Sequence, residues 1–298
     1  MPELPEVETI VRGLLPRIRG RRISAVAIEW PRVVDARGAS VDALVGHEIV
    51  DVRRAGKFVV ARLENGAHVA VHLRMTGRLI ADPSAVLPHT RFVWRFDDGG
   101  ALVFADVRKF GRLRVLSGDP ERELGIGIDP FDPRLDAELL RRMLAGRRTP
   151  IKVWLLDQRF IAGIGNIYAC EALYVAGIRP TRRSGNLSAP ERHKLLRALR
   201  KVLAKAIGRR GSSVDDYVDV EGNQGGFQKL LAVYGRRGLP CRRCKTPIRR
   251  IVLAQRGTFF CPVCQRSAVP THRKVGPVRV AGRSAPTNSM VRIGSAKS

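Results

Sequence analysis

The sequence predicts an α+β protein of several domains, because different parts of its 298 residues carry three different patterns. Residues 23–116 contain short runs of β-forming residues between turn signals, which favours a β-rich lobe. Residues 135–207 repeat apolar side chains at helical spacing. Residues 241–264 hold two close pairs of cysteines. We therefore expect domains at 1–130 and 131–235, a small module at 236–266 and a tail at 267–298.

The first lobe is predicted to begin with a helix over residues 5–15. Pro5 suits a first helical turn, and apolar residues recur at helical spacing from Val7 to Leu15. Four β-forming runs follow, at 58–63, 68–73, 92–96 and 101–107. The turn pairs Asn65-Gly66 and Asp98-Gly99 divide these runs into two hairpins. A sandwich or a barrel-like sheet accounts for this pattern.

The second lobe is predicted to be helical. A proline-rich, acidic stretch at 129–133 marks its start, and helices are expected at 135–144, 151–156, 166–176 and 190–207. Ser188 is a possible N-cap for the last of them. That helix carries apolar residues on one face and basic residues on the other, namely Arg192, Lys194, Arg197, Arg200, Lys201 and Lys205.

The charge balance points to a polyanionic partner. Lys and Arg number 54 against 27 Asp and Glu, a net charge of +27. Nucleic acid is the leading candidate, and the alternative is a merely solvated basic surface. No apolar stretch approaches the roughly 20 residues of a spanning helix, and the acidic N-terminus does not fit a signal peptide. We therefore expect a cytoplasmic chain without a membrane partner or disulfides, with a disordered basic tail at 267–298.

The cysteine pairs predict one structural Zn²⁺. Cys241-x2-Cys244 and Cys261-x2-Cys264 supply four thiolates, which leave the metal no open position for water. Between the pairs, residues 248–260 favour a hairpin with Arg256 near its tip, where it could contact phosphate or be an ordinary exposed arginine. Cys170 lies in an apolar helical stretch and is expected to be a buried small hydrophobe.

The first residues suggest a nucleophile. Removal of Met1 would expose a secondary amine at Pro2, which titrates near the α-amino range of about 7.7–8.0. A useful fraction of such an amine is neutral and nucleophilic at pH 7. The alternative is a helix lead-in, in which Glu3 stabilises the helix dipole.

Seven segments occur in an order that resembles formamidopyrimidine-DNA glycosylase. They are "PELPEVET" at the start, "GKF" at 56–58, "HLRMTG" at 72–77, "DVRKFG" at 106–111, "IKVWLLDQRFIAGIGNIYACEAL" at 151–173, "VYGRRGLPC" at 233–241 and the cysteine finger. The resemblance covers residues 2–266. It implies an N-terminal β-sandwich lobe, a helix-two-turn-helix lobe and a C-terminal zinc-finger β-hairpin, with DNA between the lobes. Endonuclease VIII shares the proline and the finger but departs from "PELPEVET".

The resemblance also implies residue roles. Pro2 matches a Schiff-base nucleophile that attacks C1′ of the damaged nucleotide, and Glu3 matches the acid that protonates the sugar or the leaving group. Lys57 matches a lysine that assists β-elimination. Without the resemblance, Lys57 would be interpreted as a solvated lysine at a strand edge. Arg256 matches a finger arginine that holds phosphate and assists δ-elimination.

Further matches concern DNA contacts. Met75, Arg108 and Phe110 match a wedge that fills the gap left by an extruded base, while Met75 and Phe110 alone would read as core residues. His89, Lys152 and Asn166 match DNA-contacting positions, and residues 211–227 match a loop that closes over the extruded base. Asp129 stands where the family commonly has glutamate, which puts any contact there in doubt.

These observations favour a monomeric DNA glycosylase with lyase activity in base excision repair. It would excise 8-oxoguanine and formamidopyrimidines from double-stranded DNA, act on abasic sites and cut the strand by β,δ-elimination. The alternatives are an endonuclease VIII-like enzyme for oxidised pyrimidines, a non-catalytic DNA-binding relative, and a zinc-ribbon factor. An N-terminal amine is unnecessary for DNA binding alone, and the long β lobe disfavours a zinc-ribbon factor.

Overall fold

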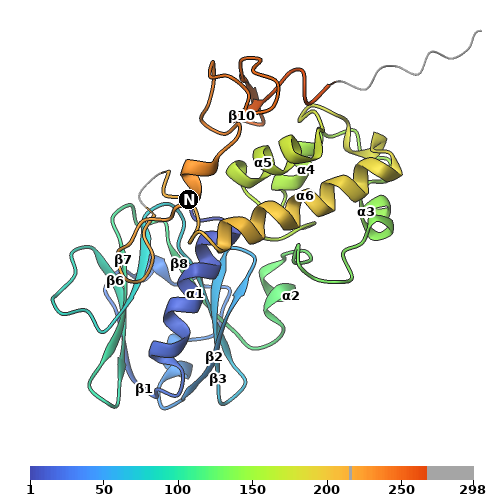
Figure 1. Cartoon of the computed structure of the whole chain (residues 1–298). Coiled ribbons are helices and arrows are strands. Elements are labelled where there is room, and N and C mark those ends of the chain that lie inside the picture. The colour runs from blue at the N-terminus through green and yellow to red at the C-terminus, as the bar shows by residue number, and fades with distance from the viewer. Residues whose placement is uncertain (215–216, 267–298) are drawn as a thin grey trace, which may run out of the picture. The chain divides into compact units, whose positions relative to one another are not determined.

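The computed structural model describes residues 1–214 and 217–266, which form a β lobe, a helical lobe and a finger (Figure 1). The predicted tail at 267–298 lies outside the described residues. Within the described ranges, no helix is both long and apolar enough to cross a bilayer.

The first lobe is a sandwich of two antiparallel four-stranded sheets, as predicted. One sheet has the order β1 (Ile23–Ile28), β6 (Thr90–Phe96), β7 (Ala101–Asp106), β5 (Gly77–Ala81). The other has the order β2 (Ile49–Ala55), β3 (Phe58–Leu63), β4 (His68–His72), β8 (Arg112–Leu116). The turns at Asn65-Gly66 and Asp98-Gly99 join β3 to β4 and β6 to β7, so both predicted hairpins are confirmed.

Aromatic residues and one helix fill the core of this lobe. The Phe92 ring stacks on Phe104 and Trp94, with centroids 5.0 and 5.7 Å away. Helix α1 (Leu4–Ile18) packs Val7, Ile10 and other apolar residues against the same core. Each such side chain contributes about 1.5–3 kcal/mol when fully buried. This packing fixes the start of the chain against the sandwich.

Helix α2 (Pro120–Leu124) packs against the β lobe, where Leu124 lies beside Ala55 and Val60. The second lobe contains α3 (Ala137–Leu144), α4 (Ile151–Leu156), α5 (Asn166–Ala176) and α6 (Ala189–Ile207). The four helices predicted beyond the boundary at 129–133 are confirmed as α3 to α6. Ser188 caps α6 by accepting a hydrogen bond from the Glu191 backbone N–H at 3.3 Å. Short 3-10 turns lie at Pro31–Val33, Val41–Leu44, Ser184–Asn186 and Phe227–Leu230.

The finger follows a segment that is anchored to α5. The Glu171 carboxylate accepts hydrogen bonds from the backbone N–H groups of Ala232, Val233 and Tyr234, each at 2.9 Å. Beyond this anchor, β9 (Arg249–Leu253) and β10 (Arg256–Phe260) form the predicted hairpin, and Arg256 pairs with Leu253 at its tip.

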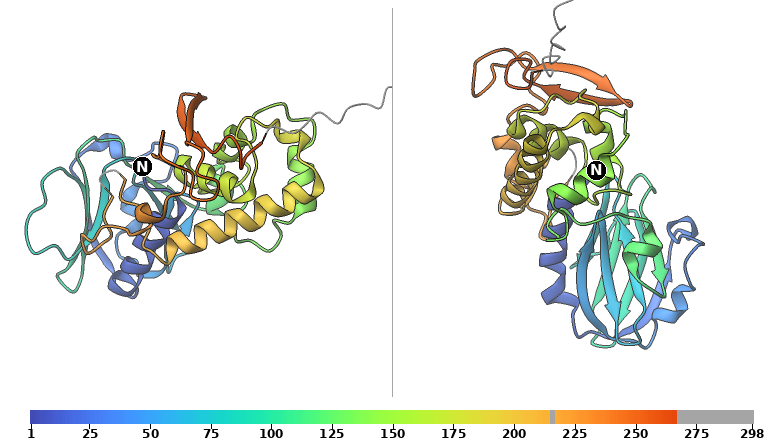
Figure 2. Two further views of the ribbon diagram at one scale, coloured as in Figure 1. Left: turned by 45° about the horizontal axis from the view of Figure 1, so that its top comes forward. Right: turned by 90° about the vertical axis from the view of Figure 1, so that its right-hand side faces the viewer.

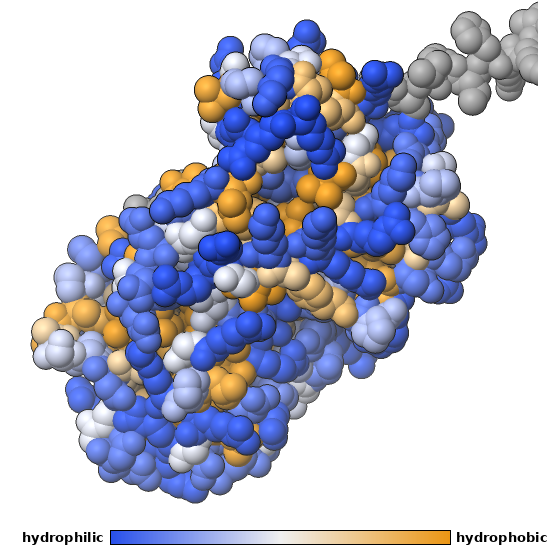
Figure 3. All heavy atoms as spheres, viewed as in Figure 1, coloured by the Kyte–Doolittle hydropathy of each residue, from blue (hydrophilic) through white to orange (hydrophobic). Residues whose placement is uncertain are grey.

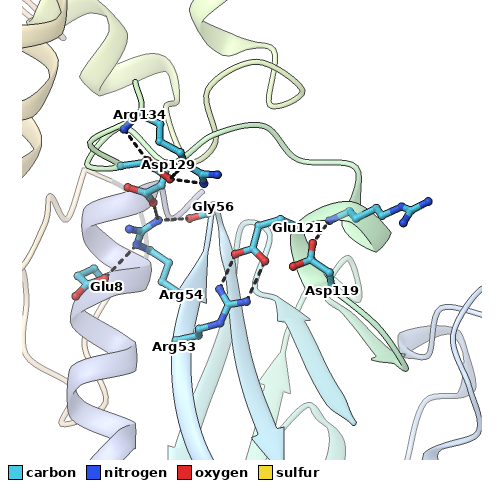
Figure 4. A network of polar contacts seen from close by, with 10 residues as sticks. Glu8, Arg53, Arg54, Gly56, Asp119, Glu121, Asp129 and Arg134 are labelled. Carbon is cyan, nitrogen blue, oxygen red and sulfur yellow. Dashed lines mark hydrogen bonds and ion pairs between the residues drawn. The ribbon is translucent and has the colours of Figure 1, made fainter. Parts of the chain in front are cut away.

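An ion-pair network ties the connection between the lobes to α1 and β2 (Figure 4). The Arg54 guanidinium on β2 lies 3.1 Å from the Glu8 carboxylate of α1 and 2.7 Å from the Asp129 carboxylate of the connector. The Arg54 side chain is only 9% exposed, so water screens these pairs weakly. Asp129 therefore does make a contact in spite of its short side chain.

Candidate active site

Glu3 connects the N-terminus to the helical lobe. It is the N-cap residue of α1, yet its carboxylate accepts hydrogen bonds from the backbone N–H groups that begin α5. The distances are 2.9 Å to Gly165 and Ile167 and 3.3 Å to Tyr168. Helix N-termini favour negative charge, and α5 has no side-chain cap of its own. A Cβ atom at Gly165 would lie 2.3 Å from the Glu3 carboxyl carbon, so this approach requires glycine.

Burial raises the pKa of Glu3, while the Lys57 charge and the α5 backbone N–H groups oppose the rise. The residue is 4% exposed. A carboxyl group whose pKa lies above its ordinary value holds its proton more readily, and can therefore act as a general acid.

Glu6 is a second buried carboxyl group, and sequence reasoning gave it no role in the site. It accepts hydrogen bonds from the Glu3 backbone N–H at 2.8 Å, from the Ser212 backbone N–H at 2.7 Å and from the Tyr168 hydroxyl. Burial and the adjacent Glu3 raise the pKa of Glu6 to about 7. The one signal in the sequence is a glutamate three residues after an N-cap position.

Glu6 thereby reaches the start of the loop at 211–227. Gly211 has a φ of +77°, and a Cβ atom there would lie 2.6 Å from the Glu6 Oε1 atom. Both the left-handed backbone and the close approach of the carboxylate require glycine at this position. The first turn of α1, α5 and this loop consequently share one buried polar cluster.

Lys57 lies in the two-residue turn between β2 and β3 and is 7% exposed. Its interpretation as a solvated lysine is therefore wrong. Burial lowers the pKa of Lys57; the charges of Glu3 and Glu6 oppose this change, and Arg256 adds to it. The structure thus brings Glu3, Lys57 and Arg256 within electrostatic reach of one another. Pro2 is buried directly before Glu3, and its nitrogen forms the peptide bond to Met1 in the full chain.

Lys152 and Asn166 hold the finger hairpin against the helical lobe. The Lys152 Nζ donates to Asn166 Oδ1 at 2.5 Å and to Thr258 Oγ1 at 2.7 Å, and Asn166 Nδ2 donates to the Gly257 carbonyl at 3.0 Å. Lys152 has no exposed surface. Its ammonium group therefore already has protein acceptors next to Arg256, rather than lying open to phosphate.

The predicted wedge residues lie on two loops that Asp106 ties together. Its buried carboxylate accepts hydrogen bonds from the Thr76 hydroxyl and from the Arg108 and Phe110 backbone N–H groups. Met75 precedes Thr76 and is half-buried, whereas Phe110 is 47% exposed, so the interpretation of Phe110 as a core residue is wrong.

His89 and Arg108 line a hollow of about 470 Å³ beside the wedge. His89, Arg74 and Lys109 have left-handed φ values of 63°, 55° and 58°. Such backbone is uncommon for residues other than glycine and gathers at functional loops.

The four finger cysteines fit a zinc ion. Their Sγ atoms lie within 4.8 Å of one another, with Cys241 and Cys264 at 3.9 Å and Cys244 and Cys261 at 3.4 Å. A tetrahedron of Zn–S bonds of about 2.3 Å separates its sulfur atoms by about 3.8 Å. All four are free of disulfides. Cys170 is buried as predicted, and burial raises the pKa of its thiol to about 11.

The chain is thus a two-lobed protein with a buried carboxyl cluster where a β-sandwich meets a helical lobe, and with a finger that can hold a metal ion. Three family models match the chain. They describe the formamidopyrimidine-DNA glycosylase N-terminal domain at residues 1–113, its H2TH domain at 126–218, and a zinc finger found in FPG and IleRS at 238–266. The chain belongs to the formamidopyrimidine-DNA glycosylase family.

Curated relatives and solved structures agree with this assignment. The formamidopyrimidine-DNA glycosylase of Chloroflexus aggregans is 46% identical over 271 residues, which cover 89% of this chain and 98% of the relative. A complex of Lactococcus lactis Fpg with DNA containing an abasic site is 35% identical, with a TM-score of 0.80 and coverage of 89% and 100%. MutM (Fpg) from Thermus thermophilus is 41% identical, with a TM-score of 0.80 and coverage of 89% and 98%.

Proposed function

We propose that the chain is a bifunctional DNA glycosylase and abasic-site lyase of base excision repair. It removes oxidised purines, 8-oxoguanine and formamidopyrimidines, from double-stranded DNA. One observation carries the proposal, namely the Glu3 carboxyl group, which is buried next to Pro2 and lies within electrostatic reach of Lys57 and Arg256. The relatives bear the glycosylase name, and similar solved structures contain DNA with Fapy-dG or an abasic site.

The reaction begins at Pro2 once Met1 has been removed. The lone pair of the secondary amine forms a bond to C1′ of the damaged nucleotide. The glycosidic bond breaks, and Glu3 gives its proton to the sugar or to the departing base. The sugar ring opens to an iminium ion, which serves as an electron sink. Loss of the C2′ proton then expels the 3′-phosphate, and a second elimination expels the 5′-phosphate.

The remaining residues position these steps. Lys57 assists the first elimination, and Arg256 holds phosphate and assists the second. Met75, Arg108 and Phe110 fill the space left by the extruded base, whose unstacking costs a few kcal/mol. His89 and Asn166 contact the DNA backbone, while Lys152 positions the hairpin that bears Arg256. The zinc ion, held by Cys241, Cys244, Cys261 and Cys264, would keep that hairpin rigid. The proposed reaction requires no residue from a second copy, so we propose a monomeric enzyme.

Borohydride trapping on a duplex with a single 8-oxoguanine tests the proposal. Reduction of the iminium should fix the protein to DNA, and peptide mapping should place the adduct on Pro2. Lys57 is the competing amine, because burial lowers its pKa and makes it a better nucleophile than an ordinary lysine. An adduct on Lys57 would overturn the assignment of the nucleophile.

Two matched proteins separate the roles of Pro2 and Glu3. A chain with a retained N-terminal extension has an amide nitrogen at Pro2, so it should bind DNA but neither excise bases nor cleave abasic sites. Glu3→Gln should block base excision more than cleavage of a preformed abasic site, because that substrate has no base to protonate. Normal excision by the extended chain would refute the mechanism.

A further inference from the structure

The exposed face of α6 carries an unneutralised row of cations. Lys194, Arg197, Lys201 and Lys205 are all exposed, and their spacing places them on one side of the helix. Across residues 1–214 and 217–266, none of these four side chains forms an ion pair or a hydrogen bond with another side chain.

Other helices of this chain neutralise exposed arginines. Arg12 on α1 pairs with Glu8 at 2.8 Å, and Arg141 on α3 pairs with Glu138 at 2.6 Å. Like charges three or four residues apart destabilise a helix. The row on α6 therefore costs stability, which a bound polyanion would offset.

A fifth cation is held in place beside this row. The Arg243 guanidinium lies 4.3 Å from the centroid of the Tyr174 ring and donates to the Tyr174 carbonyl at 3.1 Å. With Lys194, Arg197 and Lys201 it lines a hollow of about 500 Å³ at the end of α5, and no acidic residue lines that hollow. We refer to these three residues, Lys205 and Arg243 as the α6 basic face.

The α6 basic face points away from the candidate active site. The opposite side of α6, which includes Val202 and Leu203, packs against Leu4 and Tyr168 next to Glu3. In the right-hand view of Figure 2, α6 lies on one side of the helical lobe, while the finger hairpin extends to the other. Figure 3 views the α6 side, where hydrophilic side chains cross the surface of the helical lobe. One duplex in the active site would therefore leave this face free.

We propose that the α6 basic face binds the phosphates of a second DNA duplex while the first occupies the active site. From Lys194 to Lys205 the row extends about 16 Å along a straight helix. A duplex presents one negative charge per roughly 1.7 Å, so a straight, rigid row of donors can meet several phosphates. The lining residues at the C-terminal end of α5 are small, namely Val175, Ala176 and the C-cap residue Gly177, and include no aromatic side chain. The protein could then pass directly from one DNA segment to another. This inference rests on the proposed function only in that the first duplex occupies that site.

The test removes three charges from the face. Lys194→Gln, Arg197→Gln and Lys201→Gln are combined in the full-length, zinc-bound protein. A matched control combines Arg19→Gln, Arg62→Gln and Arg122→Gln, three exposed residues of the β lobe and α2. Glutamine is a good helix former, and removing like charges relieves repulsion, so the α6 variant should fold normally. Circular dichroism checks this.

The measurement is the release of a labelled duplex containing a tetrahydrofuran abasic analogue as unlabelled, undamaged duplex is added. For the wild type and the control, the release rate should rise with competitor concentration, and sedimentation should detect a complex with two duplexes. For the α6 variant, which keeps Lys205 and Arg243, the release rate should rise much less with competitor concentration. The log–log salt slope of second-duplex binding should fall by about 2.7, at about 0.9 per lost phosphate contact.

Three results would overturn the inference. Competitor-dependent release by the α6 variant at the wild-type rate would show that this face does not bind the second duplex. A loss of affinity for the first duplex, greater in the α6 variant than in the control, would place the face in the main DNA track. Accelerated release by polyglutamate but not by DNA would make an acidic protein segment the occupant. Borohydride trapping reports on the proposed function separately, because it needs only one duplex.

Discussion

The variant Glu6→Gln tests the buried polar cluster that contains Glu3 and Glu6. The test is how the free energy of unfolding depends on pH. The pKa of the Glu6 carboxyl group is about 7 in the folded chain against an ordinary value of 4.5. The folded state therefore binds more protons than the unfolded state between these pH values, so stability falls as pH rises. The contribution of Glu6 is fully present below pH 4.5 and is lost as pH rises through 7.

The size of the effect follows from the two values. Their difference, at about 1.4 kcal/mol per pKa unit, corresponds to about 3 kcal/mol of unfolding free energy. Glutamine does not titrate, so this component disappears in the variant. Oε1 accepts from Tyr168 and Ser212, and Oε2 accepts from Glu3. The glutamine oxygen can replace only one of these atoms, and an unpaired buried N–H costs about 1–3 kcal/mol.

Urea unfolding at pH 4.5 and pH 8 measures this prediction. The stability of Glu6→Gln relative to wild type should rise by about 3 kcal/mol between the two conditions. Glu29→Gln is the matched control, because Glu29 is exposed. The control should follow the wild-type pH dependence. If the stability of Glu6→Gln changes with pH in parallel with wild type, Glu6 does not titrate in this range and the reasoning is wrong.

Four further predictions concern the DNA contacts and the finger. The Arg108 guanidinium suits the acceptor-bearing edge of a cytosine that base extrusion leaves unpaired. Arg108→Ala should therefore narrow the preference for cytosine over adenine opposite the lesion by about 1–3 kcal/mol, measured from excision rates on the two duplexes. An equal loss of rate on both duplexes would contradict this base contact. Cys244→Ser should remove zinc, measured by metal analysis, and weaken DNA binding while both lobes stay folded; full binding without zinc would contradict this. Lys152→Met should speed amide exchange in the finger hairpin, by a factor that corresponds to about 1–3 kcal/mol, because the hairpin loses the hydrogen bonds from Lys152. The salt slope of DNA binding should stay unchanged. A slope lower by about 0.9 would show instead that Lys152 contacts a phosphate. Deletion of residues 267–298 should flatten the salt dependence of non-specific binding, and an unchanged slope would show that this segment does not touch DNA.

The sequence predicted those elements whose pattern is local. The β3 run is apolar and ends at an Asn-Gly turn, and α6 has a cap residue and an apolar stripe, so both were found. The individual strands β1, β2, β5 and β8 were not found. In β2, Arg53 and Arg54 interrupt the apolar pattern. These arginines form ion pairs with Glu121 and Asp129, which lie far away in the sequence. Such pairing leaves no periodic signal in a single sequence.

The candidate site divides in the same way. Pro2, Glu3, Lys57 and Arg256 stand in motifs, so their positions could be named from the sequence. Glu6 and Asp106 act mainly on backbone N–H groups, which every residue type except proline possesses, so no motif identifies the donors. The burial of Lys57 and Lys152 depends on how the lobes and the finger meet, which no local pattern encodes.

The link between Glu3 and α5 affects the order in which the protein matures during synthesis. Glu3 is made first, but its Gly165 donor follows 162 residues later, and Ser212, which binds Glu6, follows later still. At about 5–20 residues per second, the N-terminal carboxyl groups wait about 10–30 s on the ribosome for their first partners from the helical lobe. By the proposed mechanism, an unfinished chain therefore has no assembled active site, and its contact with DNA does not lead to strand cleavage.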